Sequence, residues 1–176
     1  FLETVYDGIK IKLSIKTRIG LESPKEFEEI LGIYNQYPVE ELTIHPRVQK
    51  DFYKNTPNLE VFRMALQESK NPVCYNGDIF MVDDYKKFRK EFPQVDAVML
   101  GRGLLRNPGL GDEIMEGKQL QKDTLRAFHD ELCAGYQEIM SGDRNVLFKM
   151  KEVWFYMGQS FVDADKYLKE IRKVNR

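Results

Sequence analysis

Short apolar segments alternate with amphipathic segments along the first half of the chain. Apolar and polar residues alternate over 9–16, which predicts a strand, and further strands are predicted at 41–44, 72–75 and 96–100. Between these strands, apolar residues recur at helical spacing. The predicted strands end roughly 25–30 residues apart, which is the length of a βα unit. Four such units predict parallel strands joined by right-handed helical connections.

Two architectures fit this repeat: an open doubly wound sheet and half of an eight-stranded barrel. After about residue 117 the pattern changes, and no further strand is predicted. Apolar residues instead form three stripes at helical spacing, over 125–139, 146–157 and 164–174. The sequence therefore predicts an α/β region followed by an all-α helical bundle.

Composition limits the class of protein. The 176 residues are 42% hydrophobic and 31% charged, which is typical of a folded chain rather than a disordered one. Because 27 Lys and Arg face 28 Asp and Glu, any contact with nucleic acid must come from local patches. No apolar stretch approaches the roughly 18 residues of a membrane span. Cys74 and Cys133 have no metal-type spacing and suit a reducing cytoplasm, so we expect a cytoplasmic protein without a metal site.

Each predicted strand ends in a polar or glycine-rich segment, at 16–20, 45–47, 76–78 and 101–103. Ligands of parallel βα proteins bind at the carboxyl ends of the strands. Arginine matches the oxygens of a phosphate, and glycine lets the backbone approach closely, so these segments together suit an anionic, phosphorylated ligand. Each segment alone has an ordinary alternative, such as a turn, a structural histidine or a solvated strand end.

With these segments in this order and spacing, the chain resembles the tRNA-dihydrouridine synthases. The resemblance rests on four strand-end motifs and one motif of the helical tail: Ser14–Gly20, Leu42–Arg47, Pro72–Ile79, Asp96–Gly103 and Leu147–Glu152. It implies an FMN-containing TIM barrel followed by a helical RNA-binding domain. The implied reaction is the reduction of tRNA uridine to 5,6-dihydrouridine, with NADPH as the reductant. The implied domains are a half-barrel over 1–116 and a tRNA-binding helical domain over 117–176.

The resemblance also implies roles for single residues. Lys16 matches the lysine at the pyrimidine edge of the flavin, where a cation stabilises the anionic reduced ring, and His45 matches a histidine that helps hold the cofactor. The loops around the ribityl chain and phosphate of FMN are matched by Asn76, Gly77, Asp78, Gly101 and Arg102.

Contacts with RNA are expected from four cations. Lys149 and Lys151 lie in the helical tail, whereas Arg18 and Arg47 are placed to reach either RNA or the cofactor. Residues 142–176 carry eight basic and five acidic side chains, a local excess in a chain of net charge −1. A modest patch of this kind fits shape-based binding of tRNA through its phosphates.

The chain contains only part of the barrel and lacks the catalytic cysteine that the family's enzymes have. The family's barrel has eight strands, of which this chain supplies four. The general-acid cysteine of the family lies in the earlier half, and neither Cys74 nor Cys133 occupies that motif. We therefore expect a C-terminal fragment of a synthase that is inactive alone and contains no catalytic residue. Its unpaired strand edges favour self-association.

Two other functions fit the same residues. Another FMN barrel oxidoreductase, in the manner of dihydroorotate dehydrogenases, would act on a small molecule and would not need residues 117–176. A non-enzymatic module would bind RNA or a phosphate through the tail and the loops.

Overall fold

The computed structural model describes residues 1–175. It divides into two compact units. The first unit consists of residues 1–78 and 88–100, and the second of residues 79–87 together with the described residues from 101 onward.

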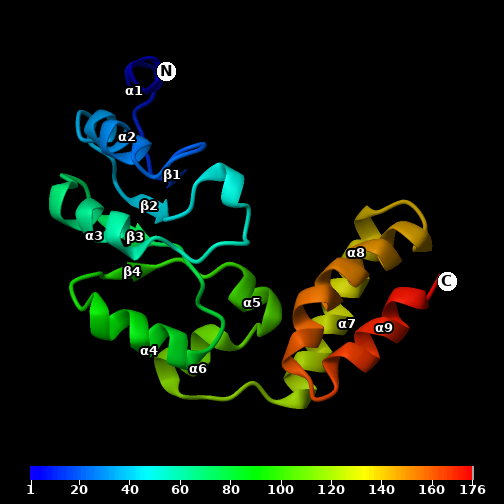
Figure 1. Ribbon diagram of the computed structural model, residues 1–176. Helices are drawn as coiled ribbons and strands as arrows, with labels where there is room; N and C mark the ends of the chain where they lie inside the picture. The colour runs from blue at the N-terminus through cyan, green and yellow to red at the C-terminus, as the bar shows by residue number, and fades with distance from the viewer. Residues whose placement is uncertain (176) are drawn as a thin grey trace. The chain divides into compact units, whose positions relative to one another are not determined.

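Four parallel strands form the sheet of the first unit (Figure 1). They are β1 (Ile15–Arg18), β2 (Leu42–His45), β3 (Val73–Tyr75) and β4 (Ala97–Val98). The strands lie side by side in the order β1-β2-β3-β4, and every neighbouring pair is parallel. A doubly wound sheet reverses its strand order at a switch point. Within residues 1–175 the sheet has no such reversal, and its order is that of consecutive units in a βα barrel.

Helices α2 (Glu26–Tyr34) and α3 (Leu59–Glu68) cover the same face of this sheet (Figure 1). The first unit also contains α1 (Leu2–Gly8), the 3-10 helix η1 (Gln49–Asp51) and the last residues of α4 (Val82–Glu91). An aromatic cluster forms the core beneath the helices. The ring of Tyr75 stacks on Phe88 at 4.0 Å between centroids and meets the edge of Phe62 at 4.9 Å. The hydrophobic core therefore fills the helical side and leaves the other face of the sheet to polar side chains.

The first strand is shorter than the alternation over 9–16 predicts. Strand β1 begins at Ile15, and Ile11 is 75% exposed. Within the described residues β1 pairs only with β2, whose first residue, Leu42, is the partner of Ile15. Residues 9–14 lie outside the sheet, although the Leu13 carbonyl accepts a hydrogen bond from the Glu40 N–H at 2.9 Å, and their alternation does not correspond to the two faces of a sheet. The other three predicted strands are confirmed, with small shifts at their ends.

Glu26 organises the start of α2. The sequence Ser23-Pro24-Lys25-Glu26 is a capping pattern, and the Glu26 carboxylate accepts hydrogen bonds from the backbone N–H groups of Leu21, Glu22 and Ser23 at 2.9, 3.0 and 2.6 Å. These three donors lower the pKa of the Glu26 carboxyl. The loop that follows β1 is therefore tied to the helix after it.

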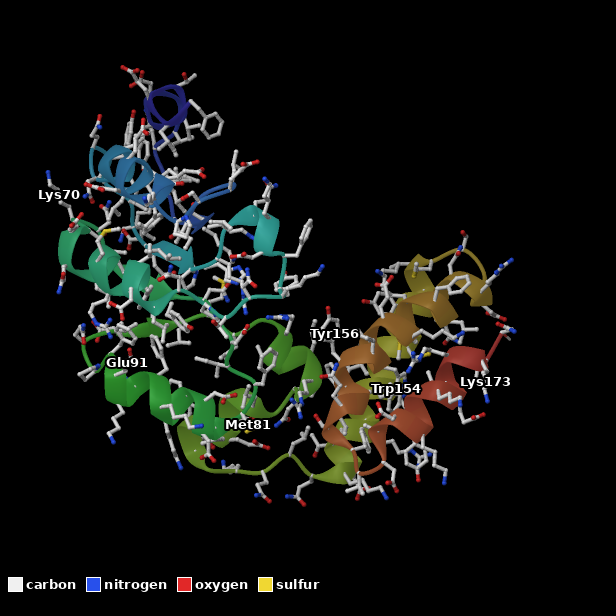
Figure 2. The ribbon with its side chains drawn as sticks, in the orientation of Figure 1. Lys70, Met81, Glu91, Trp154, Tyr156 and Lys173 are labelled. Atoms are coloured by element: carbon white, nitrogen blue, oxygen red, sulfur yellow. The ribbon has the colours of Figure 1, made fainter. Side chains whose placement is uncertain are left out.

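Helices make up the second unit. Besides the first residues of α4, they are α5 (Arg102–Arg106), α6 (Leu110–Glu116), α7 (Lys122–Ile139), α8 (Asp143–Met157), the 3-10 helix η2 (Gly158–Ser160) and α9 (Ala164–Lys173). The three apolar stripes of the sequence correspond to α7, α8 and α9, and α8 contacts both of the others. Trp154 on α8, labelled in Figure 2, lies 5.8 Å from Phe161 between ring centroids. The expected boundary between 116 and 117 falls between α6 and α7 and stays a prediction. No described helix is long and apolar enough to cross a membrane.

Candidate functional site

The register of the sheet gathers cations on the face opposite the helices. Lys16 is aligned with Thr43, and Arg18 with His45. Successive side chains of a strand point to opposite faces, so Lys16 and Arg18 share one face while Thr17 between them points to the other. Thr17 accordingly accepts a hydrogen bond from the Tyr34 hydroxyl on α2, at 3.1 Å. The polar face near the carboxyl ends of β1 and β2 therefore carries Lys16, Arg18 and His45.

Lys16 and Arg18 form a positively charged pair on this face. Burial lowers the pKa of the Lys16 ammonium first, and the neighbouring Arg18 guanidinium lowers it further. Arg18 is held in place because its guanidinium donates to the carbonyl oxygens of Val48 and Gln49, at 2.9 and 3.3 Å. Two neighbouring positive charges on one face of the sheet favour the binding of an anion there.

His45 is neutral in this setting. Burial, and then the charges of Arg18, Arg47 and Lys16, lower the pKa of its imidazole to about 4. The Arg47 guanidinium lies 3.2 Å from His45 Nε2 and can only donate, so Nε2 is the acceptor and the ring proton lies on Nδ1. The imidazole ring is stacked beside Tyr53, with 6.1 Å between centroids. At neutral pH the histidine thus offers one N–H donor without adding to the local positive charge.

A buried ion pair joins the segments that follow β2 and β3. The Arg47 side chain is 2% exposed, and its two terminal nitrogens donate to the two carboxylate oxygens of Asp78 at 2.9 and 2.5 Å. Arg47 Nε also donates to the Asn55 carbonyl oxygen at 2.5 Å. Bidentate pairs of this kind fix geometry as well as charge. Arg47 therefore holds together the loop that follows β2 and the loop that follows β3. The expected contact between Arg47 and RNA stays a prediction.

Asn76 and Gly77 shape the segment after β3. The Asn76 backbone N–H donates to Ile44 of β2 at 2.9 Å, and its side-chain amide donates to the Met99 carbonyl at 2.8 Å, so it ties together three strand ends. A Cβ atom on Gly77 would lie 1.9 Å from the Tyr75 hydroxyl oxygen. Tyr75 is buried, which raises the pKa of its phenol, and its ring is held by Phe88. Only glycine fits at position 77 without moving this ring.

Gly101 and Arg102 belong to the second unit, where α5 begins at Arg102. The Arg102 guanidinium lies 5.2 Å from the centroid of the Phe80 ring, within cation–π range. A Cβ atom on Gly103 would lie 2.1 Å from the Ile79 carbonyl oxygen, so the two backbones approach as closely as glycine permits. No neighbouring atom lies within 4 Å of the corresponding position on Gly101.

The two lysines expected to contact RNA already have partners within the second unit. Lys149 Nζ lies 2.7 Å from a carboxylate oxygen of Glu152. Lys151 Nζ donates to the Arg172 carbonyl at 2.9 Å and also to the Val174 carbonyl, both at the carboxyl end of α9. Lys151 therefore links α8 to α9.

One functional feature is not apparent from the sequence. Tyr53 lies beside His45, and its ring centroid is 5.7 Å from the Arg18 guanidinium carbon. The only sequence signal for Tyr53 is that it is one of two adjacent aromatic residues in an otherwise polar segment. Side chains in such a segment are expected to be solvated. Cys74 is 3% exposed on β3, and burial raises the pKa of its thiol, which keeps it protonated. Within residues 1–175, no group of three or more His, Cys, Asp or Glu side chains could hold a metal ion.

Comparisons with known proteins identify the family. The family model described as dihydrouridine synthase matches residues 1–175. The tRNA-dihydrouridine(16) synthase of Vibrio parahaemolyticus is 27% identical over 172 residues, which are 94% of this chain and 52% of that protein. The enzyme of the same name from Shewanella oneidensis is 30% identical over 166 residues, 91% of this chain and 50% of its own.

A probable tRNA-dihydrouridine synthase of Helicobacter pylori is 30% identical over 153 residues, 81% of this chain and 43% of its own. The chain thus spans about half the length of the curated relatives it matches. The resemblance carried by the four strand-end segments is confirmed by the family match. The chain belongs to the dihydrouridine synthase family.

Proposed function

We propose that this chain forms the C-terminal half of the TIM barrel and the helical domain of an FMN-dependent tRNA-dihydrouridine synthase. In this proposal residues 1–116 form the half-barrel and residues 117–176 the tRNA-binding helical domain. Two observations support it. The strands follow one another in sequential parallel order, as barrel strands do, and the chain spans about half the length of its relatives. The whole protein would reduce uridine in tRNA in the cytoplasm, with NADPH as the reductant.

The observation that carries the proposal is the pair of cations on the polar face of the sheet beside a neutral histidine. This donor set fits a flavin, whose reduced ring is anionic and whose phosphate needs cations and backbone N–H groups. When bound, FMN would supply the hydride for reduction of the uracil ring. Lys16 would hold the pyrimidine edge of the flavin, and the Nδ1–H group of His45 would donate a hydrogen bond to it.

The remaining cofactor contacts would come from the loops. Asn76, Gly77 and Asp78, together with Gly101 and Arg102, would surround the ribityl chain and the phosphate. In this arrangement Arg47 acts as a positioning residue, because it is buried and fixes the carboxylate of Asp78. Arg18 is placed to meet either the cofactor or an RNA phosphate, since it lies on the same face as Lys16.

The general acid of the reaction would come from a part of the enzyme that this chain does not supply. Cys74 does not suit that role, because it lies buried within β3 with a raised thiol pKa. We therefore propose that the chain alone is inactive. Within the described residues β1 pairs only with β2, and β4 only with β3, so both outer edges are open to self-association.

Expression of the full-length gene tests the proposal. The purified protein should be yellow from bound flavin and should form dihydrouridine in unmodified tRNA when NADPH is supplied. Lys16→Met should lower the flavin content, because it removes the cation and keeps a chain of similar length. A colourless full-length protein that leaves tRNA unreduced would overturn the proposal. If the protein instead acts on a small molecule and this activity survives deletion of residues 117–176, its reaction is that of a small-molecule flavin oxidoreductase and not the reduction of tRNA.

A further inference from the structure

An exposed aromatic ring with two cationic neighbours lies on α8. The Phe148 side chain is 49% exposed. The guanidinium carbon of Arg144 lies 5.5 Å from the ring centroid, and Nζ of Lys151 lies 5.9 Å from it. Positions 144, 148 and 151 are one turn apart along the helix, so all three side chains share one side of α8.

The same residues line a cavity of about 500 Å³ in the second unit. Its walls are formed by Asp143, Arg144, Leu147, Phe148 and Asn175. This volume lies within the range of small-molecule sites, roughly 300–1,000 Å³. The cavity therefore offers a ring and a guanidinium plane for stacking. The cavity also contains the Asp143 carboxylate, which accepts hydrogen bonds, and the Asn175 amide, which both donates and accepts them.

Arg144 differs from the lysines on the same helix. Lys149 is paired with Glu152, and Lys151 is hydrogen-bonded to the end of α9. No hydrogen bond or ion pair joins Arg144 to any described residue, and its guanidinium lies over the Phe148 ring. Its charge is therefore available to a phosphate, and its planar group is available to a base.

Together these groups suit an unpaired base of RNA. Proteins recognise single-stranded RNA by stacking its bases on aromatic rings or arginine planes and by hydrogen-bonding the base edges. We propose that the α8 shelf, formed by Arg144, Phe148 and Asn175 with Asp143, binds an unpaired base of tRNA. Asp143 would accept a hydrogen bond from an exocyclic amino group, and Arg144 would contact the adjacent phosphate. This inference rests on the proposed function. It adds that the helical part of the protein recognises an unpaired base.

Binding of fluorescein-labelled tRNA transcript to the 176-residue chain, followed by fluorescence anisotropy, tests the inference. Phe148→Leu keeps an apolar side chain but removes the π face, and should weaken binding about 5- to 100-fold, the effect of losing one stacked base. Arg144→Gln should weaken binding and lower the slope of log affinity against log salt by about 0.7. An unlabelled single-stranded RNA should compete better than a duplex of equal length.

Phe155 provides a matched control on the same helix. It is 58% exposed, and no cation of the described chain lies over its ring; its neighbour Tyr156 is labelled in Figure 2. Phe155→Leu should leave tRNA binding within about 2-fold of the unaltered chain, a shift well below that of one stacked base. The emission of Trp154, the single tryptophan of the chain, reports whether each variant keeps its helical fold.

Three results would overturn the inference: no binding of tRNA by the unaltered chain, full binding by Phe148→Leu, or equal losses for the changes at 148 and 155. Loss with Arg144→Gln alone would also overturn it, because the contact would then be to phosphate only. The proposed function has a separate test, since flavin content and dihydrouridine formation are measured on the full-length protein. A full-length protein that reduces tRNA while Phe148→Leu binds normally would refute the α8 shelf alone.

Discussion

Replacing Asp78 by asparagine should destabilise the chain far more than the same change in a surface ion pair. The asparagine keeps one oxygen to accept from Arg47, but its amide group would face the second guanidinium nitrogen, donor against donor. One of two charge-assisted hydrogen bonds is lost, and the Arg47 charge, 2% exposed, is left without its counter-ion. Removing one partner of a fully buried pair costs about 3–5 kcal/mol.

The cost at position 78 should lie below that range, because the Asp78 side chain is 28% exposed and water reaches this end of the pair. Loss of a charged hydrogen bond alone costs about 1.5–3 kcal/mol. We therefore expect Asp78→Asn to lower the free energy of unfolding by about 2–3 kcal/mol. Urea titration followed by far-ultraviolet circular dichroism measures this directly, with the midpoint shifted to lower urea and the slope unchanged.

Glu40→Gln is the matched control in the same unit. Glu40 pairs with Lys12 at 2.6 Å, but the two side chains are 48% and 79% exposed. An exposed pair contributes about 0–1 kcal/mol, so this variant should unfold close to the unaltered chain. Equal losses for the two variants would refute the reasoning, because the buried pair would then contribute no more than a solvated one.

Other predictions concern the neighbouring groups. Gly77→Ala should cost about 1–3 kcal/mol in the same urea assay, because its methyl group must displace the buried Tyr75 ring. NMR titration of His45 should give a pKa of about 4, below the ordinary 6.5. Between those two values the unfolded chain binds the extra proton, so His45 makes stability rise with pH from about 4 to 6.5 and has no further effect above. A midpoint near 6.5 would contradict the neutral imidazole.

Much of the sheet and of its polar face follows from the sequence. The strands predicted at 41–44 and 72–75 are both present, as β2 and β3. Once these strands are parallel, alternation alone places Lys16 and Arg18 on the same face. The sequence could not show that residues 9–14 lie outside the strand. Alternation of apolar and polar residues does not indicate whether a neighbouring strand is present to pair with.

The side-chain arrangement beneath the site could not be predicted. Arg47 lies in a polar segment, where a charged side chain is expected to be solvated, yet it is buried. Its burial depends on meeting Asp78, 31 residues later in the chain, through contacts between two loops. The same holds for Tyr53 and His45, whose stacking is fixed by the path of a loop rather than by a periodic pattern. The periodicity of apolar residues predicts helices and strands, whereas these contacts depend on the conformations of loops.

The lysine that links α8 to the end of α9 has a consequence for local opening of the helices. The Lys151 ammonium satisfies carbonyl groups at the carboxyl end of α9, where a positive charge also complements the helix dipole. The last turn of a helix ordinarily frays independently, and its amides exchange rapidly with solvent deuterium. Here fraying of α9 requires the release of a side chain that belongs to α8. Exchange at the end of α9 should therefore report the integrity of α8, whose Lys151 lies 21 residues before Arg172 in the chain.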